Sequence, residues 1–242
     1  SEPVDGGDRR TEAAAYPAPE NTENGTLAAA APALAAELLL DAAENETPRA
    51  LVQRMELALA AGRPEAALAA FDQLGDAASP SQTPAAYVYR IFADAIRESE
   101  RGGTDFATAY QDAFDTVFAE VDDRGAHELA WYLETPSVAF ERRLQSTLDR
   151  IGDAETLDRE AAVSLVRAWI GVQVDAAAAP YIGALLSADR ARRYVIDKDV
   201  RIETPAGVAL SATLVRPRTD APLPAALTFT IYADADASLR RA

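Results

Sequence analysis

The hydrophobic pattern of the chain changes from helical to strand-like near residues 188–193. Before this point, apolar residues recur every three or four positions between Thr, Pro and Gly residues that start or stop helices. After it, short runs rich in β-branched residues are bounded by Gly and Pro, which is typical of strands. We therefore predict an α-helical domain over residues 26–190 and the start of a β-containing domain over residues 191–242.

Helix starts are marked by hydroxyl or carboxylate residues that can cap them, several followed by proline in the first turn. The predicted starts are Thr26, Thr47–Pro48, Thr83–Pro84, Thr104, Thr135–Pro136 and Asp158. Pro180 is expected to break the last helical segment, so the helix that begins at Asp158 is predicted to end near Val174.

An aromatic stripe follows Thr104 at helical spacing and predicts a helix face in the core. Its members are Phe106, Tyr110, Phe114, Val117 and Phe118. Residues 57–71 resemble the turn region of a tetratricopeptide repeat, and residues 103–114 echo it faintly at a spacing of 41 rather than 34. One helical hairpin or a peptide-binding solenoid would both fit this pattern.

Composition narrows the classes of function. With 39 acidic and 23 basic residues the net charge is −16, which disfavours nucleic acid and anionic membrane as partners. The chain has no cysteine and one histidine, His127, so disulfides, thiolate metal sites and multi-histidine metal sites are excluded. Neither a cofactor nor a metal is predicted, and no apolar run is long enough to predict a membrane span.

Residues 1–25 are rich in Gly, Pro, Asp and Glu, so we expect a flexible arm there. The chain starts at Ser1 rather than Met, and acidic residues stand where a signal peptide would be basic. Removal of a leader would explain that start, and it predicts a periplasmic or secreted protein.

The histidine and the carboxylate pairs give little indication of chemistry. His127 has no serine in a Gly-x-Ser-x-Gly elbow to act on, so a structural or exposed role is expected. The carboxylate pairs are expected to face water or to cap helices. These pairs are Asp122 with Asp123, Asp197 with Asp199, and Asp234 with Asp236.

The strand pattern predicts a hairpin and a third strand. Residues 200–217 predict two strands around a tight turn, and residues 225–232 predict a buried strand that ends at Tyr232. In open α/β sheets, ligands bind beyond the carboxyl ends of strands, so the Tyr232 phenol could donate a hydrogen bond to developing negative charge. A boundary tyrosine with a hydrated hydroxyl is the other interpretation.

Residues 200–217, then Leu223–Pro224, then residues 228–232 resemble the opening of the cocaine-esterase and X-Pro dipeptidyl-peptidase class of α/β-hydrolases (CocE/NonD-type). The order and spacing of the motifs match over about 45 of the 242 residues. Two positions depart from the family pattern. Ala206 stands where the turn usually has Asp, and Ile231 stands where Pro often precedes the tyrosine.

The resemblance implies a serine hydrolase that cleaves an ester or amide, with Tyr232 as one oxyanion-hole donor. The family's Ser, Asp and His come later in sequence, so it also implies a complementary polypeptide that carries them. The expected fold is thus a mainly α N-terminal domain followed by a β-hairpin and one buried strand of an α/β-hydrolase sheet. The alternative is a helical tetratricopeptide-like interaction module without catalytic activity.

Overall fold

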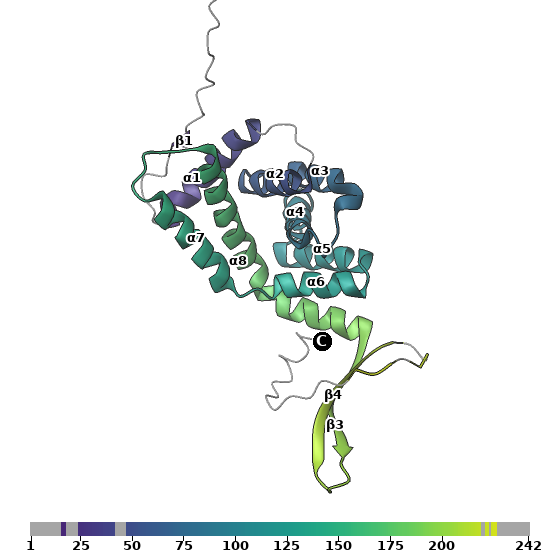
Figure 1. Cartoon of the computed structure of the whole chain (residues 1–242). Helices are drawn as coiled ribbons and strands as arrows, with labels where there is room; N and C mark the ends of the chain where they lie inside the picture. The colour runs from purple at the N-terminus through teal and green to yellow at the C-terminus, as the bar shows by residue number, and fades with distance from the viewer. Residues whose placement is uncertain (1–15, 18–23, 42–46, 219–220, 223, 227–242) are drawn as a thin grey trace, which may run out of the picture.

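The computed structural model describes residues 16–17, 24–41, 47–218, 221–222 and 224–226, and this part of the chain is mainly helical (Figure 1). The helices are α1 (Asn24–Leu40), α2 (Pro48–Ala60), α3 (Pro64–Leu74), the short 3-10 helix η1 (Gly75–Ala77), α4 (Pro84–Gly102), α5 (Phe106–Glu120), α6 (Asp123–Leu133), α7 (Ser137–Ile151) and α8 (Arg159–Arg193). The strands are β1 (Tyr16–Pro17), β2 (Thr156–Leu157), β3 (Tyr194–Glu203) and β4 (Ala209–Pro217).

Among the described residues the strands form two separate two-stranded antiparallel sheets, β1–β2 and β3–β4. The prediction of a mainly helical chain with few strands is confirmed. A hydrolase-type sheet is not established, because residues 227–232 of the predicted third strand lie outside the described residues and Ala225 and Ala226 are not in a strand.

The capping predictions are right at some helices and wrong at others. The Thr47 and Asp158 side chains accept the Ala50 and Ala161 N–H groups at 3.4 and 2.8 Å, as the sequence predicts. At α5 the cap is Asp105, one residue after the predicted Thr104, because its carboxylate accepts the Thr108 N–H at 3.1 Å. A carboxylate is the stronger acceptor for these exposed N–H groups.

Two neighbouring clusters of buried side chains make up the core. One is formed mainly by α1, α2, α3, α4, α7 and the first part of α8, and the other by α4, α5, α6 and the second part of α8. The predicted aromatic stripe is confirmed as core: Tyr110, Phe114, Val117 and Phe118 are fully buried in the second cluster, and Phe106 packs against both. Helices α4 and α8 join the clusters into one body.

Helix α8 continues through Pro180, so the predicted break near Val174 is wrong. Pro180 is exposed and costs the helix one hydrogen bond, and Ala178 and Ile182 are buried on either side of it. Figure 1 shows the light green C-terminal part of α8 running in a different direction from its first part. A proline kink accounts for that change of direction.

Among the described helices, α8 alone is long and apolar enough to cross a membrane, by length and composition only. Here it packs against α1, α2 and α7, and its buried residues belong to both core clusters. A core helix of a globular protein passes the same length and composition test.

Helices α2–α3 and α4–α5 are successive helical hairpins. Gly62 and Gly103 adopt left-handed backbone angles (φ 67° and 65°) just after α2 and α4, a conformation that glycine adopts without strain. These two glycines are the origin of the 41-residue echo in the sequence. Helix α8 contacts α2, α4, α5 and α6, so it occupies one side of this helical stack.

The predicted flexible arm is partly wrong. Tyr16 is buried against the first core cluster, and its hydroxyl donates a hydrogen bond to Asp41 at 2.6 Å. It also pairs with Leu157 in the β1–β2 sheet. Composition predicted an exposed arm, but one aromatic ring with a hydrogen-bond partner is enough to anchor this segment.

Candidate functional site

Tyr232, the predicted oxyanion donor, lies outside the described residues, as do Asp234 and Asp236. The hairpin that precedes them, β3–β4, is described. It projects from the C-terminal end of α8 and is clear of most of the helical body (Figure 1). The candidate site is therefore built from this hairpin and from the helices that hold its base.

The hairpin turn forms as the sequence predicts. Gly207 has φ 76°, and its N–H donates to the Thr204 carbonyl at 2.9 Å. The Thr204 hydroxyl donates to the Val208 carbonyl at 2.8 Å, and this second hydrogen bond across the turn also stabilises it. A side chain at the Gly207 position would be strained, so the glycine of the Ala206–Gly207 pair sets the reversal of the chain.

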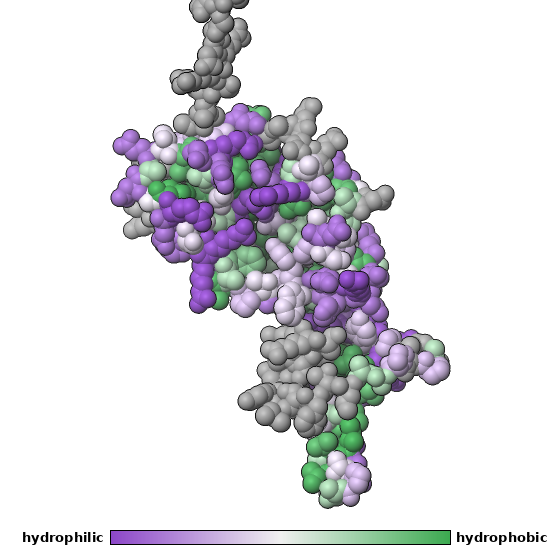
Figure 2. All heavy atoms as spheres, in the orientation of Figure 1, coloured by the Kyte–Doolittle hydropathy of each residue, from purple (hydrophilic) through white to green (hydrophobic). Residues whose placement is uncertain are grey.

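One face of the hairpin is largely apolar and exposed, and Asp197 lies on it opposite Leu214. Ile202 pairs with Leu210 and Val200 with Ala212, and Leu214 continues the same face after a bulge between Asp197 and Val200. The relative exposures of Ile202, Leu210 and Leu214 are 43%, 39% and 46%. Figure 2 shows green, hydrophobic atoms along the projecting hairpin. No other described strand pairs with either edge of this sheet.

The base of the hairpin is fixed by an arginine network. Arg193, the last residue of α8, is held by Asp189 at 2.8 Å and by Asp123 at 3.0 Å, and it also donates to the carbonyls of Phe118 and Val121. Burial disfavours the charged Arg193 guanidinium, but its bonds to Asp123 and Asp189 outweigh this and raise its pKa. The end of α5 and the start of α6 are thereby fastened to the start of β3.

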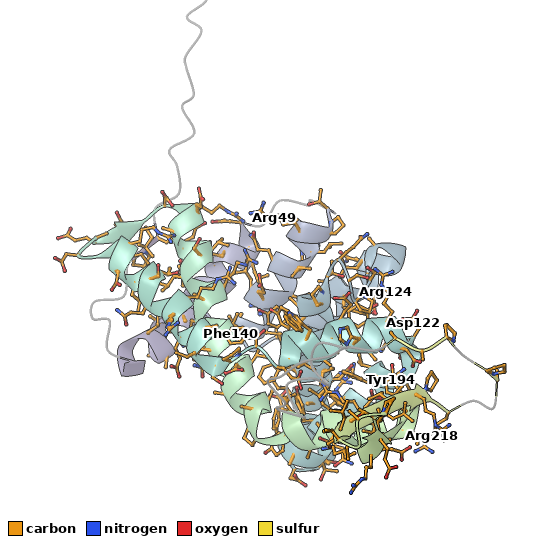
Figure 3. The ribbon with its side chains drawn as sticks, turned by 60° about the horizontal axis from the view of Figure 1, so that its bottom comes forward. Arg49, Asp122, Arg124, Phe140, Tyr194 and Arg218 are labelled. Atoms are coloured by element: carbon orange, nitrogen blue, oxygen red, sulfur yellow. The ribbon has the colours of Figure 1, made fainter. Side chains whose placement is uncertain are left out.

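Two further contacts complete the base. Arg218, which follows β4, donates to the Ala191 carbonyl at 2.7 Å, so both strands are tied to the last turn of α8. Tyr194, labelled in Figure 3 with Arg218, opens β3, and burial together with the charge of Asp123 raises its pKa. The hairpin therefore leaves the helices in a defined direction.

The carboxylate and histidine candidates have structural or exposed positions. Asp122 caps α6 by accepting the Gly125 N–H at 2.7 Å, and Asp123 pairs with Arg193, which confirms the expected capping role for the first of them. His127 is exposed on α6, as expected. Asp197 is exposed on β3, and the side chain of Asp199 lies outside the described structure.

A buried ion pair in the helical body could not be predicted from the sequence pattern. Glu56, 4% exposed, accepts hydrogen bonds from two nitrogens of Arg167 and, at 3.2 Å, from the Tyr89 hydroxyl. Burial first, and the charge of Glu56 second, raise the pKa of Tyr89 well above its ordinary value. Because α2, α4 and α8 supply one residue each, only the tertiary fold brings this trio together.

An apolar hollow of about 180 Å³ opens beside this trio, between α4, α8 and the α6–α7 connection. Its wall includes Tyr89, Tyr132 and Phe140, of which Figure 3 labels Phe140. The Phe140 ring lies 3.5 Å from the position that a Cβ atom on Gly171 would take. Asp175 lines it without a hydrogen bond or ion pair to the described residues. The hollow has the largely apolar walls of a small-ligand site and two carboxylates, Asp175 and Glu134, of which Glu134 pairs with Arg190. No nucleophile–base pair lines it.

Comparison of the chain with protein-family models, with curated proteins and with solved structures finds no match. In the part of the chain that the structure describes, no group of three or more His, Asp or Glu side chains is arranged to hold a metal ion. A functional assignment therefore has to rest on the hairpin, the helical body and the chemistry of their residues.

Proposed function

We propose that the chain is the N-terminal part of an α/β serine hydrolase that cleaves an ester or amide. The acyl group would be transferred to a serine supplied by a complementary polypeptide, and Tyr232 would donate one hydrogen bond to the oxyanion. The substrate would be a small ester or a peptide, and no cofactor is required for this chemistry.

The observation that carries the proposal is the exposed apolar face of β3–β4. An isolated two-stranded hairpin is marginally stable in water, and large aliphatic side chains on such a surface favour aggregation. Leu210 and Leu214 gain burial when further strands and covering helices extend the sheet. The hairpin thus has the form that the opening strands of a larger sheet require.

The arginine network at the hairpin base supports the same interpretation. An oxyanion donor must be held within a fraction of an ångström of its productive position. Asp189, Arg193 and Arg218 tie β3 and β4 to α8, so the helical body would hold the first strands of the sheet in place. The helical domain would then be a rigid support for the sheet rather than a source of catalytic groups.

Tyr232→Phe tests the catalytic part of the proposal. With the complementary polypeptide present, turnover of an activated ester should fall by about 100-fold or more, the scale for loss of one oxyanion donor. Tyr194→Phe is the matched control, because it removes a hydroxyl at the hairpin base and should leave turnover unchanged. Equal turnover for wild type and Tyr232→Phe would remove Tyr232 from the site.

Intact-mass analysis of protein purified from its native source tests the need for a second polypeptide. A companion chain that copurifies and carries a Gly-x-Ser-x-Gly elbow is the expected result. A monodisperse 25.7 kDa species without companion would contradict the two-chain proposal.

A second candidate function is a helical interaction module, favoured by the successive hairpins α2–α3 and α4–α5. In solenoids of this kind, partners bind along one concave surface of the stacked helices. Here α8 of the same chain contacts α2, α4, α5 and α6. The face of these helices that α8 covers is therefore not open to a peptide partner, and for this reason we favour the hydrolase proposal.

A further inference from the structure

A polar hollow of about 190 Å³ lies between α7 and α8, away from the hairpin. Its wall is made of Arg143, Ser146, Thr147, Arg150, Ser164 and Arg167. These are three guanidinium groups and three hydroxyl groups, with no carboxylate among them. The volume is far above the roughly 10–15 Å³ that one water molecule needs, so a small polyatomic ion can enter.

The two helices place these residues by simple periodicity. Arg143, Thr147 and Arg150 are four and then three positions apart on α7, so they share one helix face. Ser164 and Arg167 are three positions apart on the facing helix α8. Packing of α7 against α8 closes the hollow from two sides.

Two of the arginines have no charged partner among the described residues. The side chains of Arg143 and Arg150 are exposed and form no ion pair or hydrogen bond with any residue that the structure describes. Thr147 already donates its hydroxyl proton to the Arg143 carbonyl at 2.9 Å. The hydroxyl donors left for a ligand are those of Ser146 and Ser164.

The third arginine is held in position by the buried trio. The Nε and Nη2 atoms of Arg167 donate hydrogen bonds to Glu56. Its Nη1 atom makes no hydrogen bond within the described structure. Burial lowers the pKa of Arg167, but Glu56 more than offsets this, so the guanidinium stays charged. Since Glu56 balances Arg167, the formal charge left in the hollow is that of Arg143 and Arg150, two positive charges.

We propose that this hollow binds a tetrahedral dianion, namely phosphate, free or as a phosphomonoester. Guanidinium groups present paired N–H donors that match phosphate oxygens, and hydroxyls supply additional donors. Two excess positive charges match the double negative charge of phosphate near neutral pH. The net charge of the chain is −16, yet this wall has three arginines and no carboxylate, so its local charge is opposite in sign to that of the whole chain. A bound anion would offset the repulsion between the guanidinium groups.

Binding can be measured on the full chain by isothermal titration with sodium phosphate, against sodium chloride at the same ionic strength. Saturable binding of phosphate and none of chloride is expected. Arg150→Ala should weaken phosphate binding at least tenfold. Arg142→Ala is the matched control, because Arg142 is an exposed neighbour on α7 that does not line the hollow, and its phosphate affinity should equal that of the wild type.

O-phosphoserine and serine form the second arm of the experiment. Tighter binding of O-phosphoserine than of inorganic phosphate would identify a phosphomonoester as the ligand, and the reverse order would identify the free ion. Circular dichroism and the melting temperature without phosphate establish that both variants fold. No saturable phosphate binding by the wild type, or equal loss in Arg142→Ala and Arg150→Ala, would overturn the proposal.

Discussion

The hydroxyls of two buried tyrosines should have opposite effects on stability. The Tyr110 hydroxyl is buried and has no hydrogen-bond partner among the described residues, while the Tyr89 hydroxyl donates to the buried Glu56 carboxylate. Replacing each with Phe removes one oxygen atom and retains the ring. For Tyr110 this keeps the contacts with Phe106 and Tyr181, whose ring centroids lie 5.7 and 6.0 Å away.

The magnitudes follow from the burial of each group. An unsatisfied buried polar group costs about 1–3 kcal/mol, so Tyr110→Phe should raise the free energy of unfolding by about 1–2 kcal/mol. A hydrogen bond to a charged group contributes about 1.5–3 kcal/mol, so Tyr89→Phe should lower it by about 1.5 kcal/mol, since Arg167 still satisfies Glu56. The melting temperatures of the two variants should then differ by about 5–14 °C at 2–4 °C per kcal/mol.

Urea unfolding followed by far-ultraviolet circular dichroism measures both variants. The slope of the transition should be unchanged, so that a shift of the midpoint reports stability alone. Tyr181→Phe is the control, because its partly exposed hydroxyl makes no hydrogen bond with the described residues. A loss of stability in Tyr110→Phe equal to that in Tyr89→Phe would refute the reasoning and indicate a bound water on the Tyr110 hydroxyl.

Two further predictions concern pH and the hairpin base. Burial raises the pKa of Tyr89 and Tyr110 above the unfolded value of about 10. Below that pH both phenols are neutral in the folded and the unfolded chain, and the stability of the fold is fully present. As the pH rises above it, the unfolded chain loses these protons first, so the free energy of unfolding falls. The urea midpoint should fall above about pH 10, less steeply in Tyr110→Phe, and an equal slope in both proteins would contradict this. Asp189→Asn removes the buried charge partner of Arg193 and should cost about 1–3 kcal/mol. Hydrogen exchange at the start of β3 should then accelerate, and unchanged exchange would show that the network does not hold the hairpin.

Local signals in the sequence predicted much of the helical body. The Thr47 and Asp158 caps, the aromatic stripe of α5 and the change to strands after Arg193 each depend on residues close together in sequence. The Ala206–Gly207 turn was predictable for the same reason, because only glycine adopts φ 76° without strain. Local propensity decides such features before any packing occurs.

Other local signals were overridden by packing. Pro180 predicts a helix break, but burial of Ala178 and Ile182 on both sides keeps α8 continuous. Composition predicts a solvated arm, but the Tyr16 ring finds a place in the core and a partner in Asp41. In both cases the burial of apolar surface exceeds the local penalty.

The sequence alone determined that the chain is mainly helical, that strands replace helices near residues 188–193, and that it contains one histidine and no cysteine. Only the tertiary structure brought Glu56 to Arg167, which are 111 positions apart, and set the arginines of α7 beside those of α8. The physical reason is that caps, turns and helix faces depend on neighbours within a few residues. Ion pairs and hollows between helices depend on which faces pack together, and that is decided by the burial of the whole core.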